Sequence, residues 1–116
     1  MHKRQPLTRR IRFALAGLRE AYRGEASFRT QCAASVLVGL VLLWTRPAPI
    51  WWAALTLCCA LVLAAELVNT ALERALDALH PHDHPGIRAA KDCAAAAVLV
   101  LAAGAGLVFA AFFVSQ

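Results

Sequence analysis

Acidic residues are scarce in this sequence of 116 residues, with only seven against twelve lysines and arginines. Charged residues of both signs make up 16% of the chain, whereas 60% is hydrophobic and the mean hydropathy is +0.59. A single domain of this size can bury only part of so much apolar surface, so the composition excludes an ordinary soluble domain and predicts contact with lipid. An acid inside an apolar helix is energetically expensive there and calls for a functional reason.

The sequence also lacks the usual motifs for phosphates and metals. Neither glycine-rich phosphate loop, G-x-x-x-x-G-K-[ST] or G-x-G-x-x-G, is present. None of the four cysteines has metal-ligand spacing, so we interpret them as small buried hydrophobes. His80, His82 and His84 alternate beside two prolines, which favours a polar loop over a zinc site. A nucleotide would therefore have to be held by carboxylate-bound magnesium and by Lys91.

Three apolar runs separated by proline-containing turns predict an all-α membrane protein with three transmembrane helices, at about 27–45, 50–79 and 86–114. The second helix is expected to continue beyond its apolar part, which ends at Ala65, as a mixed helix on the cytoplasmic side. The whole chain, 1–116, is predicted to be one domain.

The N-terminal segment, about 5–24, is predicted to be an amphipathic helix on the membrane surface. Its apolar residues recur at steps of four, three and four, with arginines on the other side. Eight basic residues lie before the first apolar run: Lys3, Arg4, Arg9, Arg10, Arg12, Arg19, Arg23 and Arg29. This excess predicts a cytoplasmic N-terminus and a C-terminus outside, and it favours a membrane surface over nucleic acid as partner.

One helical face carries the polar residues of the second predicted span. At 100° per residue, Glu66, Asn69, Thr70, Glu73 and Asp77 fall on a single stripe. Three carboxylates on one face repel each other unless cations or protons lie between them. The stripe therefore predicts a functional site rather than a solvated surface.

Depth divides the roles along this stripe. Glu66 adjoins the apolar run, so we predict that it is a general base at the lipid boundary. Glu73 lies nearer the cytoplasm, where it suits a divalent cation, and Glu25 at the same level is its expected partner ligand. Arg88 and Lys91 are expected in the same plane, where they could meet phosphate oxygens. Together these residues predict phosphoryl transfer to a lipid hydroxyl.

A different class of function stays open from the residues alone. A small oligomeric transporter or proton carrier would use Glu66 as an intramembrane proton site. That reading leaves Glu25, Glu73, Asp77 and Lys91 without a role, and a purely structural membrane subunit explains even less.

Three motifs carry a resemblance to a known family. They are Glu25-Ala26-Ser27-Phe28-Arg29, the run from Glu66 to Glu73 with Asp77, and Ala90-Lys91-Asp92. With these motifs at matching spacings over nearly its whole length, the chain resembles the bacterial membrane diacylglycerol kinases, a family that includes undecaprenol kinases.

The resemblance implies a homotrimeric helical bundle in the bacterial inner membrane, each subunit having an amphipathic surface helix and three spans. It implies transfer of the γ-phosphate of ATP to a lipid hydroxyl, with diacylglycerol giving phosphatidic acid. It assigns Glu66 as the base and Glu25 and Glu73 as Mg²⁺ ligands. The residues implied near the nucleotide are Phe13, Glu25, Asn69, Glu73, Asp77, His84, Lys91 and Asp92. Those implied near the lipid are Ser27, Phe28, Arg29, Trp44, Trp52 and Glu66.

The same resemblance leaves the lipid open. Ala94 and Ala95, where many diacylglycerol kinases have Gly-Ser, are similar to the undecaprenol branch, whereas the E-A-x-F-R run is similar to the diacylglycerol branch. Three thin helices can hardly enclose ATP and a lipid headgroup alone, so we expect sites shared between subunits.

Overall fold

The computed structural model describes residues 6–116 and folds them into four helices. These are α1 (Leu7–Gly24), α2 (Ala26–Thr45), α3 (Pro49–Leu79) and α4 (Pro85–Ser115). The last three are long and apolar enough to cross a membrane. The predicted all-α class with three such helices is thus confirmed. Lys3, Arg4 and Gln5, which belong to the predicted basic flank and surface helix, lie outside the described residues.

Prolines and one left-handed residue set the helix ends. Pro49 and Pro85 open α3 and α4, where a missing backbone N–H is harmless. At the end of α2, Arg46 adopts a φ of 45°, and its N–H donates to the carbonyl of Leu42 at 2.9 Å. This left-handed cap turns the chain, and the prolines that follow prevent α2 from continuing.

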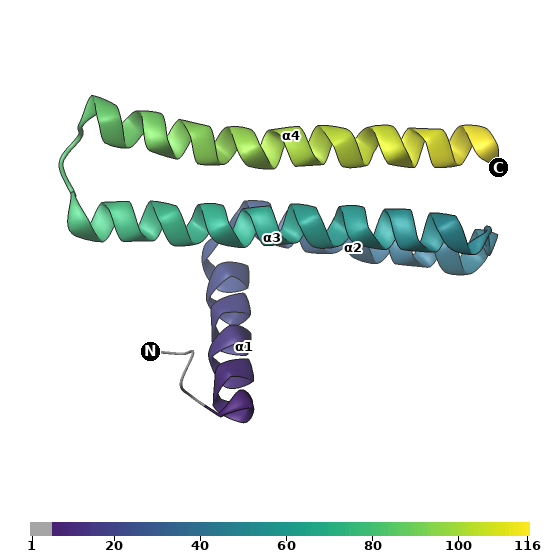
Figure 1. The fold of residues 1–116 in the computed structure, drawn as a ribbon, viewed down its shortest axis with the longest axis horizontal. Coiled ribbons are helices and arrows are strands. Elements are labelled where there is room, and N and C mark those ends of the chain that lie inside the picture. Colours follow the sequence, from purple (N-terminus) through teal and green to yellow (C-terminus); the bar gives the residue numbers. More distant parts are fainter. Residues whose placement is uncertain (1–5) are drawn as a thin grey trace.

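Helix α3 is the centre of the fold because it contacts each of the other three helices. Figure 1 shows α2, α3 and α4 lying side by side along one axis, α3 antiparallel to the other two, with α1 directed away from this axis. α1 meets α3 part of the way along it, so the ends of α3 and α4 that are joined by residues 80–84 extend beyond α1. If the three long helices cross a bilayer, this geometry leaves α1 parallel to its surface.

The tightest packing lies towards the end where α2 turns into α3. Leu42, Leu55 and Phe112 form a buried apolar cluster with contributions from all three long helices. The rings of Trp51 and Phe112 meet edge to face, with centroids 5.6 Å apart. Many other large apolar side chains of these helices are exposed, for example Leu107 on α4. Apolar surface of this extent is suited to lipid or to further protein rather than to water.

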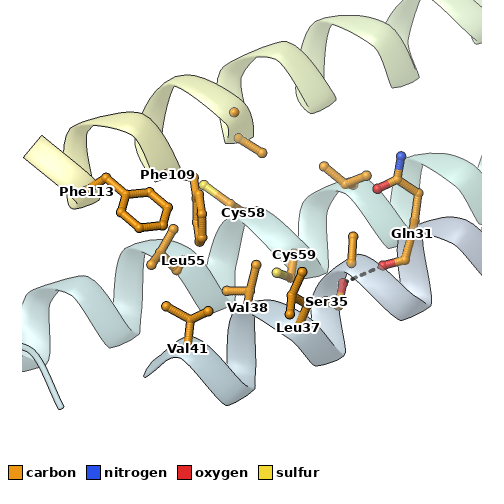
Figure 2. A pocket seen from close by; sticks show the side chains of 14 residues that line it. Gln31, Ser35, Leu37, Val38, Val41, Leu55, Cys58, Cys59, Phe109 and Phe113 are labelled. Carbon is orange, nitrogen blue, oxygen red and sulfur yellow. Dashed lines mark hydrogen bonds between the residues drawn. The ribbon is translucent and has the colours of Figure 1, made fainter. Parts of the chain in front are cut away.

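A pocket of about 400 Å³ opens between α2, α3 and α4. Figure 2 shows Val38 and Val41 of α2, Leu55 of α3, and Phe109 and Phe113 of α4 around it. Its few polar groups come mainly from α2, where the Ser35 hydroxyl donates to the carbonyl of Gln31 (Figure 2). The pocket is therefore an apolar recess in the middle of the bundle.

Candidate active site

Glu66 is the most deeply buried acid in the described residues, with only 3% of its surface exposed. It lies on α3 one turn after Val62, which lines the apolar pocket. The hydroxyl of Ser27, in the first turn of α2, donates to its Oε1 at 2.6 Å. That length is typical of a hydroxyl bound to an ionised carboxylate. The family resemblance implies that Ser27 lies near the lipid. In the structure its hydroxyl is hydrogen-bonded to Glu66.

The next turns of α3 place oxygen atoms on the same stripe. The amide Nδ2 of Asn69 donates to Oε1 of Glu73 at 2.9 Å, and Thr70 between them is buried. The other amide atom, Oδ1 of Asn69, is buried without a hydrogen-bond partner in the described part of the chain. Amide and carboxylate oxygens are both ligands that a hard cation accepts, although here the amide nitrogen, not Oδ1, is the atom that meets Glu73. These residues therefore fit the magnesium that the sequence predicts.

Glu25 begins α2 and contacts a cation rather than another acid. Its Oε1 lies 3.7 Å from Nη2 of Arg74 on α3. The two predicted metal ligands thus have different partners. Glu25 faces Arg74, whereas Glu73 accepts a hydrogen bond from Asn69. Within residues 6–116, no three histidine, cysteine or acidic side chains gather as a metal cluster. Water and phosphate oxygens commonly complete the coordination shell of Mg²⁺.

Arg74 is the site residue that the sequence interpretation missed. Its Nη1 donates to Oε1 of Glu20 on α1 at 2.7 Å, while Nη2 faces Glu25. A signal was present in the sequence, because Arg74 is the single cation between Glu66 and Leu79. Spacing along one helix did not reveal which acids on other helices it would reach.

Two ion pairs lie near the connection between α3 and α4, at the end that extends beyond α1. Lys91 of α4 contacts the carboxylate of Asp77 on α3, and Arg88 contacts Asp83 in the connecting segment. His84 caps α4, its Nδ1 accepting the N–H of Gly86 at 2.9 Å. These side chains surround a pocket of about 260 Å³, which is lined also by His80 and His82. Asp92, next to Lys91, is exposed.

The predicted lipid-facing residues at the start of α2 are held by the protein itself. Phe28 is buried, with 3% of its surface exposed. The guanidinium of Arg29 donates to the carbonyls of Tyr22 and Arg23, at 2.8 and 3.2 Å. A cation placed on the last carbonyls of α1 stabilises that helix end and fixes the junction between α1 and α2. Lipid contact by Phe28 and Arg29 stays a prediction.

Three further aromatic residues differ in their surroundings. Trp44, at the end of α2, is 86% exposed. Trp52 is half-buried against the apolar cluster at the same end of the bundle. Phe13 is exposed on α1. The two tryptophans lie at the far end of the bundle from Lys91. A lipid that contacts them and also reaches the polar end of α3 would therefore run along the length of the helices.

Three helices long and apolar enough to cross a membrane, with a buried carboxylate and further acids along one face of α3, define the class as a multi-pass membrane protein with an acidic helix face. Comparison with known proteins gives the family. A family model described as prokaryotic diacylglycerol kinase matches residues 12–113. The chain belongs to the prokaryotic diacylglycerol kinase family. The resemblance noted in the sequence is confirmed, and so, at the level of the family, is the lipid phosphotransferase class.

Individual relatives carry two different substrate names. A diacylglycerol kinase of Synechocystis sp. is 38% identical over 101 residues, which cover 84% of this chain and 57% of that protein. An undecaprenol kinase of Bacillus subtilis is 35% identical over 86 residues, covering 74% of this chain and 70% of the relative. A diacylglycerol kinase of Escherichia coli is 32% identical over 88 residues, covering 76% and 72%. The chain thus spans little more than half of the Synechocystis protein and most of the other two.

Proposed function

We propose that this protein transfers the γ-phosphate of ATP to the hydroxyl of a membrane lipid, with diacylglycerol as acceptor and phosphatidic acid as product. Undecaprenol is the alternative acceptor, because relatives of similar identity carry each name. The observation that carries the proposal is the buried carboxylate of Glu66. It is bonded to Ser27 at the point where α3 changes from apolar to polar.

Glu66 acts as the general base. Its carboxylate takes the proton of the lipid hydroxyl as that oxygen bonds to the γ-phosphorus of ATP and the bond to the ADP oxygen breaks. Ser27 holds Oε1 in a fixed direction, which leaves the other carboxylate oxygen for the proton. Positioning of this kind supplies much of the rate enhancement in phosphoryl transfer.

Glu73, Asn69 and Glu25 are proposed to hold Mg²⁺ with the phosphates of ATP. The support is that Asn69 Oδ1 is buried without a partner in the described part of the chain, and that Glu73, one turn further along α3, supplies a carboxylate. Bound there, magnesium would neutralise charge on the phosphates. Lys91, held by Asp77, supplies a cation for phosphate oxygens. Phe13, His84 and Asp92 complete the proposed nucleotide surroundings.

The apolar pocket offers room for the hydrocarbon part of the acceptor. Val62 lines it one turn from Glu66, so a chain lying in the pocket would direct its head towards the base. Trp44 and Trp52, at the far end, are proposed to contact the same lipid.

In the membrane, α1 is proposed to lie as an amphipathic helix on the cytoplasmic surface, with the C-terminus outside. The support is the basic content of α1 and its crossing direction in Figure 1. The proposed location is the bacterial inner membrane. A homotrimer with shared sites is proposed because the acids of one chain do not close a metal site by themselves within residues 6–116.

The test is lipid-dependent ADP production by purified protein in detergent with Mg²⁺ and ATP. Diacylglycerol and undecaprenol are compared as acceptors, with triacylglycerol, which has no free hydroxyl, as the matched control. We expect turnover with at least one of the two alcohols and none with the control. If neither alcohol stimulates turnover, the kinase proposal fails.

A further inference from the structure

Arg74 joins three helices at the edge of the proposed metal site. The residue belongs to α3, directly after Glu73, and its guanidinium faces Glu20 of α1 with Nη1 and Glu25, which lies between α1 and α2, with Nη2. The α1–α2 junction, where α1 ends at Gly24 and Glu25 follows, therefore lies against a single positive charge.

Gly24 makes room for this charge. A Cβ atom added to Gly24 would lie 2.3 Å from Nη2 of Arg74, well inside van der Waals contact. The guanidinium thus occupies the space that a side chain would fill at the junction. Any larger residue at this position would push the guanidinium away from its present place.

The two ion pairs are unequal. The Nη1 to Oε1 distance to Glu20 is 2.7 Å and is a hydrogen bond, whereas the Nη2 to Oε1 distance to Glu25 is 3.7 Å. The side chains of Glu20 and Arg74 are 69% and 41% exposed, so the bond to Glu20 contributes little to stability. Its geometric effect is to hold Arg74 while leaving the carboxylate of Glu25 only loosely paired.

We propose that Arg74 is the resting counter-ion of Glu25 and that Glu20, by holding Arg74, sets how readily Glu25 binds a divalent cation. Arg74 is thus a positioning residue. A cation arriving at Glu25 has to displace a guanidinium 3.7 Å away, and Glu20 is the acceptor that keeps it. This inference rests on the proposed role of Glu25 as a metal ligand.

The two partners of the ion pair are expected to have opposite effects. Arg74→Gln removes the competing charge, so divalent cations should bind about threefold to tenfold more tightly. Glu20→Gln removes the residue that shares Arg74, which then turns fully to Glu25, so binding should weaken by about threefold. A bond that served only to dock α1 on α3 would give shifts of the same sign for both substitutions.

The measurement is Mn²⁺ binding to nucleotide-free protein in detergent, followed by the electron paramagnetic resonance signal of free Mn²⁺. Arg74→Lys keeps the charge but loses the fork that reaches both acids, so its Mn²⁺ affinity should lie between those of the unmodified protein and Arg74→Gln. Arg10→Gln removes the same charge from the other end of α1, about 22 Å from Glu25 at 1.5 Å per residue, and should change binding by less than about twofold.

Shifts of the same sign for Arg74→Gln and Glu20→Gln, or no shift in either, would overturn the role of Arg74. Glu25→Gln separates this outcome from failure of the proposed metal site. If Glu25→Gln leaves Mn²⁺ binding unchanged, Glu25 is not a metal ligand, and the inference falls with that part of the proposed function. If Glu25→Gln weakens binding while the other two variants do not differ in sign, only the inference fails.

Discussion

The two ends of α3 are held to their neighbours by different forces. Near its start, Leu55 is buried with Leu42 of α2 and Phe112 of α4, and the contacts are apolar and aromatic. Past the middle, Glu66 is bonded to Ser27, and Asp77 pairs with Lys91. One continuous helix therefore carries a packing end and a chemical end. The residues that pack the bundle together are therefore different from the residues proposed to take part in phosphoryl transfer.

The largest expected effect is at the chemical end. Glu66→Gln keeps the shape and an oxygen for Ser27 but removes the base, so kcat should fall by about a thousandfold. Lipid-dependent ADP production measures this, and unfolding in detergent mixtures should show nearly unchanged stability. A decrease of less than about tenfold would contradict the role of Glu66 as general base.

The next effect is at the packing end. Phe112 has no exposed surface, so Phe112→Ala should leave a cavity and lower the free energy of unfolding by about 3–5 kcal/mol. Unfolding in mixed detergent measures this, while turnover per folded molecule should stay within about twofold. The neighbouring Phe113 is mostly exposed, and Phe113→Ala should cost less than about 1 kcal/mol. A loss of kcat in folded Phe112→Ala protein would show that the two ends are not independent.

A smaller effect is expected from the hydrogen bond that orients the base. Ser27→Ala removes one donor to Glu66, worth about 1 kcal/mol, so kcat should fall by about fivefold. The matched control is Thr30→Val on the same helix, because Thr30 is exposed and its hydroxyl donates to the carbonyl of Ala26 in its own helix. An equal decrease in both variants would mean that the effect comes from α2 as a whole and not from the bond to Glu66.

The architecture was largely accessible from the sequence because it follows from local rules. Apolar runs of membrane length give the three long helices, and prolines at positions 47, 49, 81 and 85 mark their ends. The polar stripe followed from helical periodicity, which places residues three and four apart on one face. Glu66 and Thr70 are indeed buried on that face.

Contacts between helices were not accessible in the same way. Ser27 and Glu66 are 39 residues apart, and their pairing depends on how α2 is rotated and shifted against α3. The contact of Arg74 with Glu20 and Glu25 likewise depends on the crossing of α1 over α3. Hydrophobic periodicity says which face of a helix is apolar, but not which turn of its neighbour that face will meet.

The unbroken course of α3 has a mechanical consequence. Its 31 residues make a rod of about 46 Å, longer than the roughly 30 Å of hydrocarbon in a bilayer. Helices adapt to thinner membranes by tilting, and a stiff rod that tilts swings both of its tips. A tilt of about 10° would sweep the Asp77 tip sideways by about 3 Å relative to Glu66, given a rise of 1.5 Å per residue. Bilayer thickness thereby affects where the Asp77 end of α3 lies relative to the membrane surface, while the spacing between Glu66 and Asp77 along the rod stays fixed.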